Sequence, residues 1–315
     1  MYPRLFAAIV FSFALAACGR EQTENASSPA AEPPAAVPEQ AAEPAATDTP
    51  AQAATPPAQA EQSAIDRVIA GDWREPANMA RDIWRHPRET LAFLGVTAHQ
   101  QVLEVSPGRG WYTEILVPLL REHGRYVGAI SDPAAAPNER VRGYFTQQNA
   151  DLRAKLAARP DVYGQPELRE IDAGKPDFGA PGSIDTVLTF RNVHNWLTAG
   201  QAEAMFKGFY DVLKPGGVLG VVEHRAAGDV PVGDESGYVG QDQVIALAKA
   251  AGFEFEESSE INANPADTKD HEAGVWSLPP SLRLGDKDRE KYVAIGESDR
   301  MTLRFRKPVT APDTP

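Results

Sequence analysis

The 315-residue chain has only one cysteine, Cys18, and this shortage excludes several kinds of chemistry. A lone cysteine cannot form an intramolecular disulfide, supply a cysteine-based zinc site, or act as a catalytic thiol anywhere beyond position 18. Positive charge is also scarce, because 31 Lys and Arg residues stand against 44 Asp and Glu. Nucleic-acid binding requires clustered Lys and Arg to contact phosphates, so this acidic chain is not expected to bind nucleic acid.

The apolar run near the N-terminus, Leu5 to Ala17, has only 13 residues, too few for a helix that crosses a bilayer. It follows Arg4 and ends in Leu15-Ala16-Ala17-Cys18, which resembles the lipobox of bacterial lipoprotein signals. The resemblance implies that residues 1–17 are a cleaved signal peptide and that Cys18 carries acyl chains, which anchor the protein to a membrane. Gly19, in place of Asp, implies sorting to the outer membrane of the bacterial cell envelope, with the protein facing the periplasm.

Residues 19–62 lack aromatic side chains and consist largely of Ala, Pro, Glu, Gln and Thr. Such a segment cannot bury enough apolar surface to order itself, so residues 18–62 are predicted to be the lipidated cysteine and a disordered tether. The tether contributes −6 and the signal +1 to the formal net charge of −13, which leaves −8 on residues 63–315. These remaining residues are predicted to form one folded domain of about 250 residues.

The most informative stretch of that domain runs from Gln101 to Leu116. A short apolar run leads through Pro107-Gly108-Arg109-Gly110 into a helical pattern, which predicts a strand-loop-helix unit. Glycine allows positive φ and lets a ligand approach the backbone closely, while the new helix presents free N–H groups and the positive end of its dipole. A cofactor is therefore predicted to bind at this loop.

The spacing of the glycines bears on which cofactor binds. A dinucleotide fingerprint, G-x-G-x-x-G, that begins at Gly108 requires a third glycine where this chain has Thr113. That mismatch disfavours a pyrophosphate ligand. The alternative pattern is an acid followed by G-x-G-x-G. It fits Glu104 with Gly108 and Gly110, although Ser106 occupies the first glycine position.

Short apolar runs alternate with helical patterns through the rest of the domain. Further strands are predicted at residues 125–130, 167–171, 184–190, 218–223, 253–259 and 300–306, and helices at about 138–159, 199–212 and 241–251. Residues 213–217 are predicted to form a turn before the fifth strand. Strand-helix alternation of this kind predicts a parallel sheet with both faces covered.

Five signals in this pattern fall into one order: Glu104, Asp132 and Asp172 at strand ends, the turn Leu213-Lys214-Pro215-Gly216-Gly217, and Ala250-Ala251-Gly252-Phe253. In that order they resemble class I S-adenosylmethionine (SAM) methyltransferases over about residues 78–308. The resemblance implies an α/β, Rossmann-like fold. It has seven strands, mostly parallel, with the last strand antiparallel between the fifth and sixth and helices on both faces.

The resemblance also implies a SAM site and a finer grouping. Segments such as Glu104-Val105-Ser106-Pro107-Gly108 and Asn264-Pro265-Ala266-Asp267 resemble a bacterial group of predicted methyltransferases without an assigned substrate. In the superfamily the acid of the first strand lies near the α-amino group of SAM, that of the second binds the ribose hydroxyls, and that of the third binds the adenine amino group. The residues implied to bind SAM are Glu104, Ser106, Gly108, Gly110, Asp132, Asp172 and Ala173.

The acceptor side is expected after the fourth strand. Methyl transfer is an in-line displacement that depends mainly on positioning, but a hydroxyl or acidic-carbon acceptor also needs a general base. His194 is the best-placed candidate and His224 the second, although a lone histidine is often simply packed or on the surface. Asn192 is predicted either to position a small-molecule acceptor or to cap the next helix.

Other polar residues are given structural interpretations. Residues 63–95 are predicted to form short helices that cap the sheet, with Trp73 and Trp84 as core or lid residues. Two uses are considered for Arg81 and Arg85, contact with the carboxylate of the cofactor and a solvated helical face, and the solvated face is favoured. The charges from Asp267 to Glu272 are interpreted as a solvated run, and no metal site is predicted.

Three functional hypotheses therefore stay open. The intact acids favour a SAM-dependent methyltransferase tethered to a membrane. The periplasmic location favours a non-enzymatic module that binds another small molecule in the same cleft, because SAM is normally made and used in the cytoplasm. A nicotinamide-dependent enzyme is the third hypothesis, and Thr113 in place of the third glycine opposes it.

Overall fold

The computed structural model describes residues 57–309, so the predictions for the signal peptide, Cys18 and most of the tether lie outside the described residues. Helix α1, Pro57–Ile69, begins six residues before the expected start of the domain at Ser63. Its Glu61 carboxylate accepts a hydrogen bond from the amide of Ala98 at 3.0 Å, which ties the helix to the domain. Sequence composition could not reveal this, because residues 57–62 have the Ala, Pro and Gln content of the tether.

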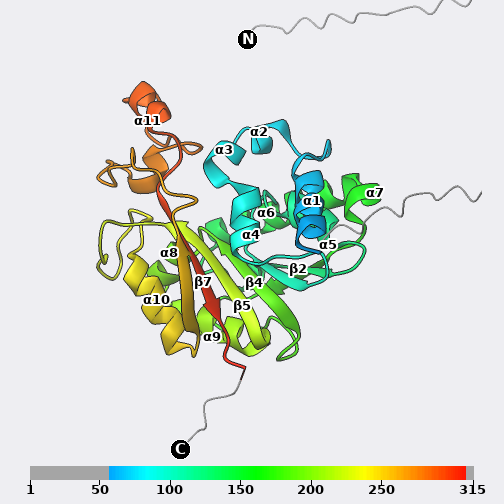
Figure 1. Ribbon diagram of the computed structural model, residues 1–315. Coiled ribbons are helices and arrows are strands. Elements are labelled where there is room, and N and C mark those ends of the chain that lie inside the picture. The colour runs from blue at the N-terminus through cyan, green and yellow to red at the C-terminus, as the bar shows by residue number, and fades with distance from the viewer. Residues whose placement is uncertain (1–56, 310–315) are drawn as a thin grey trace, which may run out of the picture. The chain divides into compact units, whose positions relative to one another are not determined.

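Seven strands form one sheet in the order β3-β2-β1-β4-β5-β7-β6 (Figure 1). Strand β7 runs antiparallel to both of its neighbours, β5 and β6, while the other pairs are parallel. This arrangement confirms the predicted fold class and the predicted position of the last strand. The strands are β1 Gln101–Val105, β2 Arg125–Ser131, β3 Glu167–Ile171, β4 Ile184–Phe190, β5 Leu213–His224, β6 Glu254–Ser259 and β7 Arg300–Arg306.

Two hydrophobic cores cover the two faces of the sheet. One contains side chains from α8, α9 and α10, and the other contains side chains from α1, α4, α5, α6 and α7. Helices on both faces explain why the central strands are apolar on both sides. The remaining helices are α2 Pro76–Met79, α3 Asp82–Arg85, α4 Pro87–Phe93, α5 Thr113–Leu120, α6 Glu139–Ala158, α7 Pro160–Tyr163, α8 Val193–Thr198, α9 Ala202–Val212, α10 Gln241–Ala250 and α11 Arg289–Ile295, with 3-10 turns η1 Pro133–Ala135 and η2 Gly274–Ser277.

Two details differ from the prediction. The helix expected at 199–212 is α9 preceded by the separate helix α8, and the break coincides with Gly200, whose φ is +67°. The predicted turn at 213–217 belongs to the long strand β5, because Leu213 already pairs with Ile184 before the register shifts. A positive φ of +77° at Gly216 still turns the backbone there, so the Pro-Gly-Gly sequence marks an irregularity within the strand.

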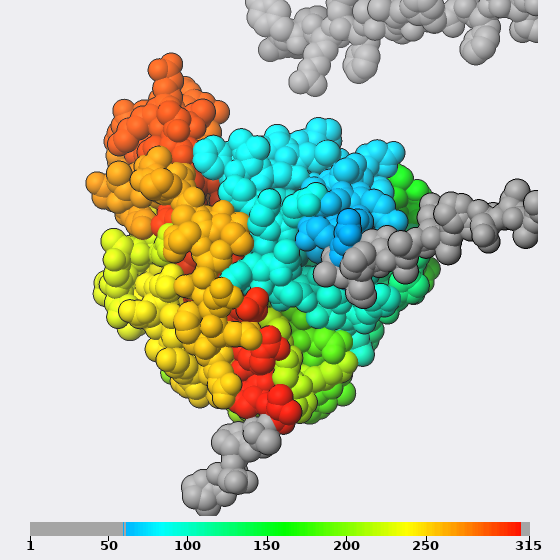
Figure 2. All heavy atoms as spheres, viewed as in Figure 1, coloured from blue at the N-terminus to red at the C-terminus, as the bar shows by residue number. Residues whose placement is uncertain are grey.

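Two segments distant in sequence lie over the end of the sheet where the parallel strands finish, and Figure 2 shows them meeting at the surface. One contains α2 and α3, as expected for short capping helices; the other spans residues 260–299. Arg81 donates to the carboxylate of Glu297 at 2.5 Å, which joins the two segments, and Arg300 at the start of β7 donates to the carbonyl of Trp84 at 3.1 Å. No helix within residues 57–309 is both long enough and apolar enough to cross a membrane.

The acidic run in the second segment is solvated only in part: Asp270 and Glu272 are exposed as predicted, but Asp267 and His271 are buried. Asp267 and His271 are 4% and 8% exposed, and the imidazole Nε2 of His271 lies 2.8 Å from Asp267 Oδ1. Asp267 also accepts hydrogen bonds from the hydroxyl of Tyr238 and the amide of Asp299. This carboxylate therefore fastens the segment to the rest of the domain, with partners that are too remote in sequence to infer.

Candidate cofactor and acceptor site

The loop after β1 has an unusual backbone. Ser106, Gly108 and Gly110 have φ values of +51°, +62° and +82°. Ser106 therefore adopts the conformation that glycine prefers, and its presence does not change the course of the loop. A Cβ at Gly108 would meet nothing closer than Gln148 at 4.0 Å, whereas one at Gly110 would lie 2.9 Å from Leu152. Gly108 thus leaves room for a ligand, and Gly110 permits close packing against α6.

Replacing Ser106 with glycine is expected to raise the free energy of unfolding by up to about 1 kcal/mol, because it removes the cost of a left-handed serine while adding some chain entropy. Urea denaturation at neutral pH measures the change. Ser106→Val serves as the opposite variant, since a β-branched residue at this φ should destabilise the chain. A glycine variant less stable than the parent would contradict this account of the loop.

Glu104 lies beneath this loop and is 2% exposed. Its Oε2 accepts hydrogen bonds from Thr113 Oγ1 and the hydroxyl of Tyr126, both at 2.7 Å. Burial raises the pKa of Glu104 to about 7, although these two hydrogen bonds act in the opposite direction. Thr113, which replaces the third glycine of a dinucleotide fingerprint, therefore has a defined role in holding the acid.

The other two acids follow neighbouring strands. Asp132 comes directly after β2, and its Oδ1 accepts the amide of Ala134 at 2.8 Å. Asp172 follows β3 and in the same way accepts the amide of Gly174 at 2.8 Å. Ala173 is half-buried and packs against the hydrophobic core. The structure thus places Glu104, Asp132 and Asp172 along one edge of the sheet, on three adjacent strands.

Asn192 joins the end of β1, where the loop begins, to the end of β4. It occupies the N-terminal cap position of α8, but its side chain makes no capping hydrogen bond. Instead, its Nδ2 donates to the carbonyl of Val105 and to Thr189 Oγ1, both at 3.1 Å. These bonds link the ends of β1 and β4, where the strand order reverses, and such a position is where α/β sheets bind ligands. The capping alternative is therefore wrong.

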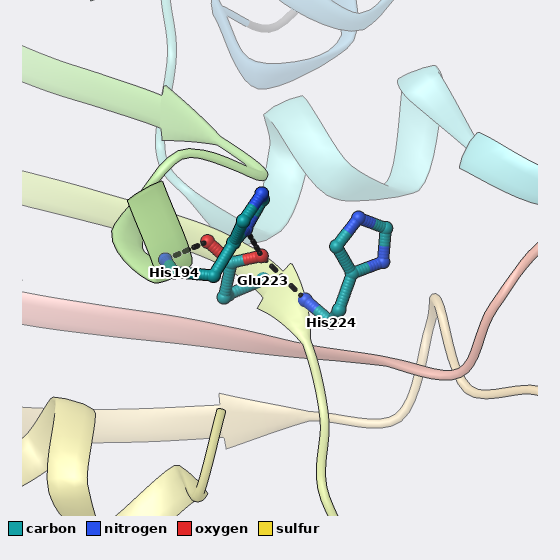
Figure 3. Close-up of side chains that lie close together, drawn as sticks. All are labelled: His194, Glu223 and His224. Carbon is teal, nitrogen blue, oxygen red and sulfur yellow. Dashed lines mark hydrogen bonds and ion pairs between the residues drawn. The ribbon is translucent and has the colours of Figure 1, made fainter. Parts of the chain in front are cut away.

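His194 is held by a buried acid. Its Nδ1 lies 3.1 Å from Glu223 Oε1 (Figure 3). Glu223 also accepts the amide of Val193 at 2.6 Å. Glu223 is fully buried, while the His194 side chain is 12% exposed. His224 projects beside them, with ring centroids 5.5 Å apart, and its Nδ1 contacts Ser298 Oγ. Both histidines considered from the sequence therefore lie side by side; Glu223 holds the His194 ring and accepts only the backbone amide of His224.

This group has a donor set that metals also use. One ligand atom from each of His194, Glu223 and His224 lies within 4.8 Å of the others, and two histidines with one carboxylate suit several divalent ions. The positive charge of nearby side chains opposes the binding of a metal cation here. Burial lowers the pKa of His224 well below its ordinary value, and the charges of His194, Arg191 and Arg300 add to that effect. A positive ion would meet the same repulsion.

A buried arginine cluster surrounds Glu297 beside this group. Arg81 and Arg85 donate to its carboxylate from the capping segment, and Arg300 does so from β7. The expectation of a solvated face for Arg81 and Arg85 is wrong, since their side chains are 22% and 4% exposed. Helical spacing predicted that these arginines share a face, but it could not identify a partner that enters from more than 200 residues away.

Arg191 is a further residue that the sequence pattern did not assign. It follows β4 directly and has a φ of +63°. Burial and the charge of Arg300 lower its pKa to about 10. The sequence signal that could have identified Arg191 was its position: it immediately precedes Asn192 and follows β4, one of the two strands between which the strand order reverses.

Comparison with known proteins finds solved structures with a related fold. No family model and no curated protein sequence matches the chain. The [4+2]-cyclase SpnF aligns with a TM-score of 0.52 and 19% identity over 76% of this chain and 86% of its own. A SAM-dependent methyltransferase from Aquifex aeolicus aligns with a TM-score of 0.49 and 13% identity, over 78% of this chain and 98% of its own. The glycopeptide N-methyltransferase MtfA aligns with a TM-score of 0.46 and 16% identity, over 74% of this chain and 100% of its own.

The chain therefore has a Rossmann-like fold, which it shares with SpnF. At such low identities the likeness shows the fold alone, and one of these three proteins is named for a cyclisation. The reaction has to be argued from the residues of the site.

Proposed function

We propose that this chain binds SAM at the carboxyl ends of β1 and β2 and transfers its methyl group to a small-molecule acceptor held near β4 and β5. The loop after β1 carries this proposal. Ser106, Gly108 and Gly110 there have positive φ, and Asp132 follows on the neighbouring strand. SAM combines an amino-acid end, a sulfonium and a ribose, so a site with an open glycine loop and separate carboxylates suits it.

Each residue has a distinct part in binding. Gly108 leaves space for close approach to the loop backbone. Asp132 gives only Oδ1 to Ala134 among the described residues, so its other oxygen is available to ribose hydroxyls. Glu104 offers a carboxylate to the ammonium end, and Asp172 with Ala173 borders the adenine. When bound, SAM supplies an electrophilic methyl carbon.

His194 is the proposed general base. With its Nδ1–H donated to Glu223, the lone pair of the neutral ring lies on Nε2. That nitrogen takes the proton from an acceptor hydroxyl or acidic carbon as the methyl group is transferred. Glu223 holds the ring and cannot turn away, because it also accepts backbone amides. Asn192 fixes the start of α8 against β1, which keeps His194 at a constant position relative to the loop.

Calorimetric titration of the full chain in detergent with SAM, its demethylated product and NAD tests the proposal. Saturable binding of the first two and none of NAD is the expected result. A chain that binds none of them would favour the non-enzymatic module suggested by the lipoprotein-like signal. Binding of NAD alone would replace the proposal with a nicotinamide-dependent enzyme.

Asp132→Ala is expected to weaken SAM binding by about ten- to a hundredfold, because charge-assisted hydrogen bonds contribute roughly 1.5–3 kcal/mol. His194→Ala should leave this affinity nearly unchanged, since the ring lies on the acceptor side. Asp211→Ala, which removes an exposed acid from α9, is the control for loss of charge. Equal SAM affinity in the Asp132 variant and the parent would refute the ribose role.

We also propose that Cys18 is lipidated and holds the domain at the outer membrane, facing the periplasm. The lipobox-like sequence before Cys18 supports this anchoring. Cys18→Ser is expected to move the protein from the membrane fraction to the soluble fraction and to abolish labelling by a fatty-acid analogue. Retention of the variant in the membrane fraction with unchanged labelling would exclude the anchor.

A further inference from the structure

A small cavity opens beside the histidine pair. Its volume is about 50 Å³, several times what a single water molecule requires, so it can hold a carboxylate or a phosphate. The polar side chains that line it are those of Arg191, His224, Ser281, Glu297, Ser298 and Arg300. The apolar part of the wall comes from Val275, Trp276 and the two prolines that follow η2. The cavity thus has both polar and apolar walls.

The charges around the cavity do not balance. Four guanidinium groups, those of Arg81, Arg85, Arg191 and Arg300, influence one another and face two carboxylates, those of Glu297 and Glu223. The guanidinium groups therefore outnumber the carboxylates in a region where Arg85 and Arg300 are buried and Arg81 and Arg191 are half-buried. Uncompensated buried charge is costly, and it persists where a ligand of opposite sign completes the site.

Several guanidinium nitrogens of this arginine cluster also lack a hydrogen-bond acceptor, and among their residues Arg300 lines the cavity. Arg300 Nε, Arg85 Nη2 and Arg81 Nη2 are buried and have no hydrogen-bond partner among the described residues. The side chains of Arg300 and Arg85 are only 3% and 4% exposed, so bulk water does not easily satisfy them. Arg191 forms no ion pair within residues 57–309, unlike the three arginines that contact Glu297. Buried polar groups without partners in a native structure indicate a missing ligand or water.

We infer that the methyl acceptor is an anionic small molecule whose carboxylate or phosphate group is bound in this cavity by Arg191 and Arg300. Guanidinium groups match such oxyanions, because two parallel N–H donors meet two oxygens. Arg191 directly precedes Asn192, which is bonded to the end of β1, so the anion is anchored next to the SAM loop. The rest of the acceptor then extends past His194. The inference rests on the proposed methyl transfer only in naming the anion as the acceptor.

Binding of inorganic phosphate to the full chain in detergent, without SAM, tests the cavity directly. Thermal denaturation is followed during a phosphate titration at constant ionic strength, with chloride as the balancing anion. The midpoint temperature of thermal unfolding of the parent should rise with phosphate concentration and then level off. Arg191→Gln should weaken the apparent affinity at least about tenfold, and Arg191→Lys should restore part of it because the charge returns. Arg191 is chosen because its removal leaves no described carboxylate without its partner.

Arg153→Gln is the matched control, since it removes one positive charge from an exposed ion pair with Glu170. It should bind phosphate as the parent does. If Arg191→Gln does not fold, Ser298→Leu provides the second test by filling the cavity without changing charge, and it should also abolish the saturable rise. The inference is overturned if phosphate raises the unfolding midpoint equally in all variants, or if it does not raise the midpoint of the parent.

Two further outcomes separate this inference from its alternatives. If zinc stabilises the chain and phosphate does not, His194, Glu223 and His224 form a metal site and the anion site is wrong. SAM affinity is measured on the same samples. Phosphate binding without SAM binding would leave an anion site in a protein that is not a methyltransferase. SAM binding without phosphate binding would leave the methyltransferase but remove the anionic acceptor.

Discussion

Replacing Glu297 with glutamine is expected to lower the free energy of unfolding by about 3–5 kcal/mol, the usual cost of removing one partner from a buried ion pair. The variant keeps the shape of the side chain but leaves the buried guanidinium groups of Arg85 and Arg300, and the half-buried ones of Arg81 and Arg191, with one fewer negative charge. The carboxylate now accepts from three of these groups. Urea denaturation at pH 7 measures the loss, and Asp211→Asn, in an exposed pair with Lys207, should cost less than about 1 kcal/mol.

The same carboxylate gives the protein a defined response to acid. The charges of Arg300 and Arg85 lower the pKa of Glu297 to about 2, against an ordinary value of 4.5, although burial alone would raise it. Because the folded pKa lies below the unfolded one, this stabilisation is fully present above about pH 4.5 and is lost as the pH falls toward 2. Glu297→Gln should therefore approach the parent in stability at low pH. If the difference in free energy of unfolding between Glu297→Gln and the parent does not change with pH, the ionised carboxylate is not the source of the stabilisation.

Glu104→Gln is expected to change the pH dependence of the free energy of unfolding in the direction opposite to Glu297→Gln. Glu104 has a pKa of about 7 in the folded chain, raised from 4.5 by burial. Its protonated form is therefore favoured by folding, and that stabilisation is present below about pH 4.5 and disappears as the pH rises through 7. The shift corresponds to roughly 3 kcal/mol. Glutamine stays neutral, so the variant should gain about that much relative to the parent between pH 4.5 and 8.

Urea denaturation of the parent and the Glu104 variant at several pH values in that range measures this gain. Taking the difference between the two proteins cancels the titration of every group that they share. Glu170→Gln, at an exposed position on β3, is the control and should show no comparable trend. A constant difference between the Glu104 variant and the parent from pH 4.5 to 8 would mean that Glu104 is ionised throughout.

The sheet could be predicted because its information is local. Residues 167–171 and 184–190 are bounded by turn residues, and the observed β3 and β4 have the same bounds. The glycines of the first loop and the acids at the strand ends are also adjacent in sequence to the elements that position them. The resemblance to methyltransferases added the antiparallel place of the last strand between the fifth and sixth, which spacing alone does not determine.

The surroundings of Glu297 and His224 could not be predicted in the same way, because their contacts join remote parts of the chain. Arg81 and Glu297 are 216 residues apart, and His224 meets Ser298 across 74 residues. Periodicity identifies a buried face but not which side chain approaches it from another segment. A charged residue on a short helix is usually solvated, and that general rule failed for Arg85 because a distant carboxylate was available.

The placement of β7 constrains how the protein is made. Strand β7 pairs with β5 and β6 on its two sides, and it follows both of them in the chain. During synthesis the ribosome has completed β5 about 75 residues before β7 emerges, so the edges of β5 and β6 have no β7 to pair with until then. Arg300, at the first position of β7, arrives with it. The arginine cluster is therefore assembled late, when the sheet closes around its last strand.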